Sequence, residues 1–279
     1  VVVEEDPETK KKSVKQIFPR YHQLDCVEKL LADVKTNGVG KRYLIQHSAG
    51  SGKSNSIAWL AHQLIGLEKN GHPMIDSVLV VTDRRILDKQ IRDNIKQFMQ
   101  VANTVAWAEH SGDLRKAIQA GKRIIITTVE KFPYVVPDIG AAHKTNHFAV
   151  IIDEAHSGQN GRNSAQMNLA LSGLASEDEM DNEDKINAMM EGRKLLPNAS
   201  YFAFTATPKN KTLETFGTLV VDENGNPVLN EDGEAQHRPF HSYTMKQAIQ
   251  EGFILDVLKY YTPISSYYKL MKTVQDDPM

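Results

Sequence analysis

The chain has 279 residues, 41% of them apolar, and its 33 Lys and Arg residues nearly balance 35 Asp and Glu residues, giving a formal charge of −2. This composition suits one large or two small globular domains with a buried core. The apolar runs are too short to cross a bilayer and the N-terminus lacks the apolar segment of a signal peptide, so we expect a cytoplasmic protein with no membrane partner. Without a general basic excess, any contact with nucleic acid must come from local patches.

The single cysteine, Cys26, lies in a helical pattern of apolar neighbours. A lone cysteine in such a pattern is usually a small core residue. We therefore expect Cys26 to be buried, and we exclude disulfides and cysteine-based metal sites.

Short apolar runs typical of β-strands alternate with helical patterns along the chain. This alternation predicts an α/β fold in which a mostly parallel sheet lies between helices. In chain order we expect a helix at 21–34, a strand at 42–46, a helix at 53–67, a strand at 77–82, a helix whose apolar side runs from Leu87 to Phe98, strands at 105–107, 123–129, 148–153 and 200–205, a short helix at 244–249 and a strand at 257–263.

Two segments interrupt this alternation. Residues 160–198 are interpreted as a loop-rich insertion, and the acidic run at 176–184 within it as a solvated loop, with metal binding as the alternative. Residues 218–232 are expected to form a small hairpin, because Asn224-Gly225 favours a tight turn. We assign no chemistry to this hairpin.

Residues 47–54 read His-Ser-Ala-Gly-Ser-Gly-Lys-Ser and lie between an expected strand and an expected helix. In such a loop, backbone N–H groups and the positive end of the helix dipole converge on one point, where phosphate binds. We expect Lys53 to bridge the β- and γ-phosphates of ATP and the Ser54 hydroxyl to ligate Mg²⁺. The other expected nucleotide-binding residues of this loop are Ala49, Gly50, Ser51 and Gly52.

A second motif, Asp153-Glu154-Ala155-His156, follows the apolar strand expected at 148–153. The strand brings both carboxylates to the same edge of the sheet as the phosphate loop. Asp153 is expected to hold the hydrated Mg²⁺, and Glu154 to orient and polarise the attacking water. His156 is a candidate for linking nucleotide state to movement, with a surface hydrogen-bonding role as the alternative.

Two further segments follow the order of motifs in superfamily 2 helicases and translocases. Gln23 precedes the phosphate loop, where that superfamily places a glutamine that reads the adenine edge beside an aromatic ring, here Phe18 or Tyr21. An ordinary helix start is the alternative. Thr205 and Thr207 match the Thr-Ala-Thr motif that couples hydrolysis to domain motion in that superfamily.

Four residues match segments that grip the nucleic-acid backbone in the same superfamily. Arg84 and Arg85 follow the strand expected at 77–82, and Thr127 and Thr128 end another expected strand. Arginines at a strand end are commonly just solvated, so this interpretation has a simple alternative.

The sequence also resembles one family within that superfamily. The run Asp-Arg-Arg-Ile-Leu-Asp-Lys-Gln at 83–90 is similar to an Asp-Arg-x-x-Leu-Asp-x-Gln segment in the R subunit, the motor and nuclease subunit, of type I restriction-modification enzymes. His47 stands where the usual phosphate loop has its first glycine, and this too is similar to that family. The similarity extends through 204–208 and 241–249, and overall from Phe18 to Tyr261.

The resemblance implies the first of two RecA-like motor lobes. In that family ATP and Mg²⁺ drive the pumping of double-stranded DNA past a complex anchored by modification and specificity subunits, and a separate nuclease domain cleaves the DNA. The expected layout is a flexible tail at 1–17, an ATP-binding lobe at 18–240 and, at 241–279, the start of a connection to a second lobe.

Two family motifs have no credible match in these 279 residues. The segments at 8–10 and 183–185 lack the context of the nuclease Asp and Glu-x-Lys motif, and 159–162 cannot supply the arginine of the second lobe. We therefore expect a fragment that binds ATP and Mg²⁺ but hydrolyses ATP weakly or not at all. Two alternatives remain open: a lobe of another superfamily 2 DNA translocase or RNA helicase, and a nucleotide-responsive scaffold module.

Overall fold

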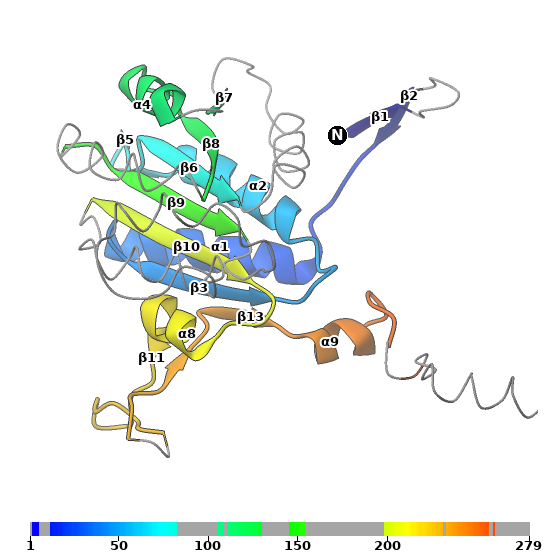
Figure 1. Cartoon of the computed structure of the whole chain (residues 1–279), viewed down its shortest axis with the longest axis vertical. Helices are drawn as coiled ribbons and strands as arrows, with labels where there is room; N and C mark the ends of the chain where they lie inside the picture. Colours follow the sequence, from blue (N-terminus) through cyan, green and yellow to red (C-terminus); the bar gives the residue numbers. More distant parts are fainter. Residues whose placement is uncertain are drawn as a thin grey trace, which may run out of the picture.

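The computed structural model describes residues 2–5, 12–82, 105–108, 111–129, 145–153, 198–230, 233–256 and 259. Its centre is a seven-stranded sheet with the order β13-β3-β10-β9-β6-β8-β7 (Figure 1). All six neighbouring pairs in this sheet are parallel. The strands are β3 (Arg42–His47), β6 (Ser77–Thr82), β7 (Val105–Trp107), β8 (Ile124–Thr128), β9 (Phe148–Asp153), β10 (Ala199–Thr205) and β13 (His241–Tyr243).

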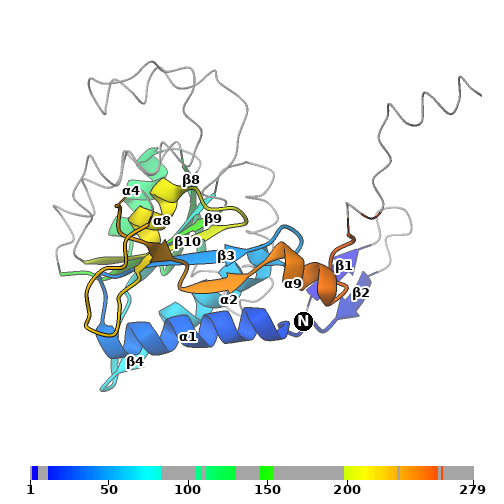
Figure 2. The ribbon, with the colours of Figure 1, turned by 90° about the horizontal axis from the view of Figure 1, so that it is seen from below.

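The central strands consist almost entirely of buried residues, because helices cover both faces of the sheet. On one face α1 (Tyr21–Asn37) and α2 (Lys53–Ile65) pack on the sheet, and on the other α4 (Ser111–Gln119) and α8 (Asn210–Phe216) do so (Figure 2). The predicted α/β fold with helices on both sides of a mostly parallel sheet is confirmed.

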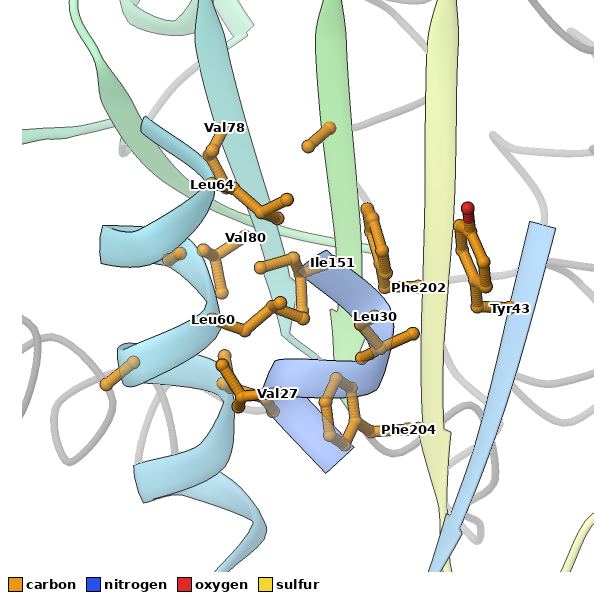
Figure 3. Close-up of a cluster of buried hydrophobic side chains, with 14 of the residues drawn as sticks. Val27, Leu30, Tyr43, Leu60, Leu64, Val78, Val80, Ile151, Phe202 and Phe204 are labelled. Atoms are coloured by element: carbon orange, nitrogen blue, oxygen red, sulfur yellow. The ribbon is translucent and has the colours of Figure 1, made fainter. Parts of the chain in front are cut away.

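In the core under α1 and α2, the apolar side of each helix packs on every second residue of the strands. Leu30 of α1 and Leu60 of α2 project onto alternate residues of the strands, among them Val80, Ile151 and Phe202 (Figure 3). The intervening strand residues face α4 and α8 instead, since successive side chains point to opposite faces of a sheet. Cys26 is buried in the first of these two cores, as expected.

The strand register aligns the carboxyl ends of β3, β10 and β9. Phe204 of β10 is paired with Ile45 on one side and with Asp153 on the other. The ends of β3 and β9 therefore lie at the same edge of the sheet, two strand positions apart, with the end of β10 between them.

The expected helix at 87–98, most of the strand at 257–263 and the acidic run at 176–184 lie outside the described residues. The expected tail contains two short strands, β1 (Val2–Glu5) and β2 (Lys12–Lys15), that pair antiparallel. Their four-residue length gives too weak a pattern to detect in a charged segment.

The second difference concerns residues 241–243. They form β13, which extends the sheet beside β3, although we assigned the chain from 241 onward to a connection. A three-residue strand has no readable periodicity. After β13, α9 (Met245–Gln250) begins at Thr244, whose hydroxyl accepts the N–H of Gln247 in a capping box.

Two small antiparallel pairs lie outside the main sheet: β4 (Glu68–Lys69) with β5 (His72–Pro73), and β11 (Thr218–Leu219) with β12 (His237–Arg238). Between β11 and β12 the turn at Gly225 is closed by Asp222, whose carboxylate accepts the N–H groups of Asn224 and Asn226. No helix in the described part of the chain has the length and apolar character that crossing a membrane requires.

Candidate nucleotide-binding site

The loop after β3 has the backbone shape of a phosphate cradle. Gly50 and Gly52 both adopt positive φ angles, of 74° and 82°, in the region that favours glycine. Gly52 is the N-cap of α2, and its carbonyl accepts the N–H groups of Asn55 and Ser56. The N–H groups of the first turn have no acceptor within the helix, so the start of α2 attracts an anion.

Lys53 opens α2 and is buried, with its ammonium group folded over the loop. Its Nζ lies 3.5 Å from the carbonyl oxygens of both His47 and Ser48. The hydroxyls of Ser48 and Ser51 are buried, and neither has a hydrogen-bond partner among the described residues. The Lys53 ammonium group, the two hydroxyls and the start of α2 together suit a polyanionic ligand such as a nucleoside triphosphate.

Asp153 lies at the end of β9, buried and at the same sheet edge as the loop. Between them, Thr205 ends β10 and is also buried, while Thr207 is exposed. A buried carboxylate at this edge, with the half-buried Ser54 in the first turn of α2, is a donor set of oxygen atoms that fits Mg²⁺. Glu154 and His156 lie outside the described residues.

Gln23 contacts the phosphate loop in this structure, and its reading of the adenine edge stays a prediction. Its Nε2 donates to the carbonyl of Gly52 at 2.9 Å and to that of Ser51 at 3.3 Å. Its Oε1 accepts the backbone N–H of Arg20 at 2.8 Å, which fixes the start of α1. A Cβ atom on Gly52 would lie only 2.6 Å from this Nε2. The Gln23 amide therefore fixes the position of the loop carbonyls by hydrogen bonding.

A histidine that sequence reasoning missed lies beside Gln23. His22 Nε2 donates to the carbonyl of Ser51 at 3.0 Å, and its ring stacks on Tyr243 with the centroids 3.8 Å apart. Tyr243 in turn accepts the N–H of Ser48 through its backbone carbonyl at 2.9 Å. Burial lowers the pKa of His22 and favours the neutral ring. Only the pairing of β13 with β3, more than 190 residues apart, brings these groups together.

His47 occupies the position of the usual first glycine because its ring fills a buried space between elements. Its Nε2 lies 2.8 Å from Nδ1 of His241, whose Nε2 lies 3.0 Å from a carboxylate oxygen of Asp25. Burial lowers the pKa of His47 to about 3, so the ring is neutral near pH 7. The same cause lowers the pKa of His241, although the Asp25 carboxylate opposes it.

The segment after α9 borders the loop on its outer side. The Glu251 carboxylate accepts hydrogen bonds from the hydroxyls of Tyr21 at 2.6 Å and Tyr243 at 2.7 Å, which hold its pKa below the usual range. The Arg20 guanidinium lies 4.0 Å from the centre of the Phe253 ring. Of the two aromatic residues proposed to pack near the base, Tyr21 is thus bound to Glu251, and Phe18 is largely exposed.

The structure describes two of the four residues proposed to grip nucleic acid. Arg84 and Arg85 lie outside the described residues. Thr127 and Thr128 end β8 with buried side chains, and their hydroxyls have no hydrogen-bond partner in the described ranges. Their contact with nucleic acid stays a prediction.

The chain is similar in sequence and fold to known proteins. The SWI2/SNF2 ATPase family model matches residues 22–276. A type I restriction enzyme HindI endonuclease subunit from Haemophilus influenzae is 27% identical over 228 residues, which cover 75% of this chain and 19% of that protein. The SsaAORF53P endonuclease subunit of Staphylococcus saprophyticus is 25% identical over 243 residues, covering 85% of this chain and 21% of that protein.

Among solved structures, the ATP-dependent Type ISP restriction-modification enzyme LlaBIII bound to DNA matches with a TM-score of 0.51 and 14% identity, covering 88% of this chain and 16% of that one. At this identity the match shows the fold alone. The chain spans about a fifth of the length of the two endonuclease subunits. Their similarity confirms the resemblance to type I restriction enzymes, and the family match covers most of the sequence. The chain therefore belongs to the SWI2/SNF2 ATPase family.

Proposed function

We propose that this chain is the ATP-binding first motor lobe of a type I restriction enzyme R subunit, in which ATP use drives translocation along double-stranded DNA. The observation that carries the proposal is Lys53, buried and folded over the carbonyls of a glycine-shaped loop. The names of the relatives support the restriction context. DNA cleavage, and assembly with modification and specificity subunits, would belong to the complete enzyme.

Each residue of the site has a distinct task in this proposal. The loop N–H groups and Lys53 bind the β- and γ-phosphates, and Ser54 and Asp153 hold Mg²⁺, which when bound neutralises phosphate charge. Glu154 orients the attacking water, and Thr205 and Thr207 transmit nucleotide state to the rest of the motor. His22 and Gln23 keep the loop carbonyls turned away from the phosphates, so that the N–H groups face them.

ATP turnover by the 279-residue chain alone is expected to be slow. The resemblance implies that a second lobe contributes an arginine to the γ-phosphate, and such an arginine accounts for a factor of about 10³ to 10⁵ in rate in related enzymes. Strong DNA-stimulated hydrolysis by this chain alone would contradict the expectation.

Calorimetric titration with ATP and Mg²⁺ tests the binding site directly. Replacing Lys53 by Ala removes a buried cation and is expected to weaken binding about 10- to 100-fold, since a hydrogen bond to a charged group contributes about 1.5–3 kcal/mol. Lys69→Ala on the exposed strand β4 is the matched control and should bind like the parent chain. Equal binding by Lys53→Ala and the parent would refute the proposal, and no binding by the parent would favour a scaffold role.

The choice of DNA over RNA needs the full-length protein. We expect ATP turnover in that protein to rise with duplex DNA and not with RNA, and Lys53→Ala to abolish translocation while leaving subunit assembly intact. Comparing the two nucleic acids at several salt concentrations separates specific stimulation from general phosphate binding. Stimulation by RNA alone would favour an RNA helicase of the same superfamily.

A further inference from the structure

A second cluster of chemically active side chains lies beneath the phosphate loop. Cys26 of α1, His47 of β3 and His241 of β13 are all buried, and one potential metal-ligand atom from each lies within 4.8 Å of the others. The lone cysteine led us to exclude a cysteine-based metal site. The fold overturns the basis of that exclusion, because it supplies two histidines from distant parts of the chain.

Asp25 prepares one of these histidines for a metal. Its carboxylate lies 3.0 Å from Nε2 of His241, so that nitrogen carries the proton and Nδ1 presents a lone pair toward His47. A carboxylate on the outer nitrogen is the usual way in which proteins orient a metal-binding histidine.

We propose that Cys26, His47 and His241 bind one Zn²⁺ ion. One thiolate and two imidazoles are a ligand set that zinc prefers, whereas Mg²⁺ prefers oxygen, so this site is chemically distinct from the nucleotide's metal site. In tetrahedral zinc sites, ligand nitrogens lie about 3.4 Å apart and nitrogen and sulfur about 3.6 Å apart, given the usual bond lengths. The 2.8 Å between the two histidine nitrogens must widen by about 0.6 Å, and the Cys26 sulfur, which lies within 4.8 Å of them, must approach them by up to about 1.2 Å.

Zn²⁺ binding at this site needs no reactant other than the protein, the ion and solvent. Two Zn–N bonds and one Zn–S bond form as the hydrated ion releases water to solvent, one water would be kept as the fourth ligand, and the thiol proton of Cys26 leaves to solvent. The proton of His47 moves from Nε2 to Nδ1, an atom with no hydrogen-bond partner among the residues described. Coordination to the cation stabilises the Cys26 thiolate in this buried position.

The ion would join α1, β3 and β13 at the point where β3 enters the phosphate loop. It would replace a single hydrogen bond between His47 and His241 with three metal–ligand bonds. The inference goes beyond the proposed function, and it stands whether or not the chain binds ATP.

Cobalt titration of the metal-free 279-residue chain tests the proposal, because Co²⁺ occupies zinc sites and reports on its ligands. We expect one Co²⁺ per chain, a thiolate-to-cobalt charge-transfer band in the near ultraviolet, and displacement by one equivalent of Zn²⁺. The charge-transfer band should disappear in Cys26→Ala, and His241→Gln should bind at least tenfold more weakly. A parent chain without the band, or an unchanged band in Cys26→Ala, would overturn the proposal.

A pair of substitutions on the exposed side of α1 remains readable even if a core variant fails to fold. The Asp25 carboxylate is 45% exposed and Glu28 is exposed on the same helix. Asp25→Asn is expected to weaken Zn²⁺ binding about 10- to 100-fold, the usual effect of removing a carboxylate behind a metal-bound histidine. Glu28→Gln should leave it unchanged. Equal affinities in these two variants would contradict the proposed geometry.

Discussion

The two halves of the sheet's carboxyl edge are built differently. At the β13–β3 end, polar side chains form two sets of hydrogen bonds. His22 and Gln23 donate to carbonyls of the phosphate loop, and His47 is linked to His241, which contacts Asp25. At the β8 end, the buried hydroxyls of Thr127 and Thr128 have no partner in the part of the chain that the structure describes. The shape of the phosphate loop therefore depends on side chains far away in the sequence. The Thr127 and Thr128 hydroxyls at the β8 end receive no such hydrogen bonds in the described structure.

A substitution in the phosphate loop itself should lower the free energy of unfolding the most. Gly52→Ala places a side chain at φ 82°, which costs about 1–2 kcal/mol, and brings Cβ within 2.6 Å of Gln23 Nε2, so overpacking adds about 1–3 kcal/mol. We expect the free energy of unfolding to fall by about 2–5 kcal/mol in urea titrations. Gly66→Ala at the other end of α2, with φ −83° and no atom nearer than 3.7 Å, should change it little.

A double variant separates the two causes. If the contact with Gln23 contributes, Gly52→Ala combined with Gln23→Ala should be less destabilised than the sum of the single variants. Strict additivity would assign the whole effect to the backbone angle.

The histidine set should make the β13–β3 half sensitive to acid. Burial depresses the pKa of His47 from 6.5 to about 3, so between these values the unfolded chain binds more protons and stability falls as pH falls. His47 alone should lower the free energy of unfolding by about 2 kcal/mol between pH 7 and pH 5. The lowered pKa values of His22 and His241 act in the same direction.

Unfolding titrations of His47→Gln at both pH values check this expectation. The variant should lose less stability on acidification than the parent chain, whatever its stability at pH 7. The exposed His72 on β5 is the matched control, and His72→Gln should keep the pH dependence of the parent. A parental pH dependence in His47→Gln would show that the ring does not stay neutral in the folded chain.

The sequence predicted what depends on local pattern. The loop between β3 and α2, the strand that ends at Asp153 and the alternation of strands and helices all follow from spacing within short windows, so these structural predictions are confirmed. The contact of Gln23 with the loop could not be predicted, because an amide at a helix start can hydrogen-bond to a base edge or to a loop carbonyl equally well. His22 and His241 were missed for a different reason: His22 stacks on Tyr243 of β13, and His241 itself lies on β13, a strand of only three residues.

Removing the Gln23 side chain, which hydrogen-bonds to the loop, should lower the free energy of unfolding by a smaller amount. Gln23→Ala deletes hydrogen bonds to the carbonyls of Ser51 and Gly52 and is expected to lower the free energy of unfolding by about 1–2 kcal/mol. It should also weaken ATP–Mg²⁺ binding, since the loop loses part of its fixed shape. Gln63→Ala, an exposed amide on α2, should alter neither quantity. Unchanged ATP binding in Gln23→Ala would show that the loop keeps its binding shape without the hydrogen bonds from Gln23.

The smallest effect, and the opposite sign, is expected at the β8 end. Replacing Thr127 by Val exchanges a buried hydroxyl, without a partner in the described ranges, for a methyl group of similar size. The free energy of unfolding should therefore rise by about 0.5 kcal/mol or stay level, because a desolvated polar group is removed. Thr82→Val is the matched comparison on β6, since its hydroxyl donates to the carbonyl of Thr127 at 3.4 Å, and it should be destabilised. If Thr127→Val loses as much stability as Thr82→Val, its hydroxyl has a partner in the segments beside β8, and the contrast between the two halves of the edge fails.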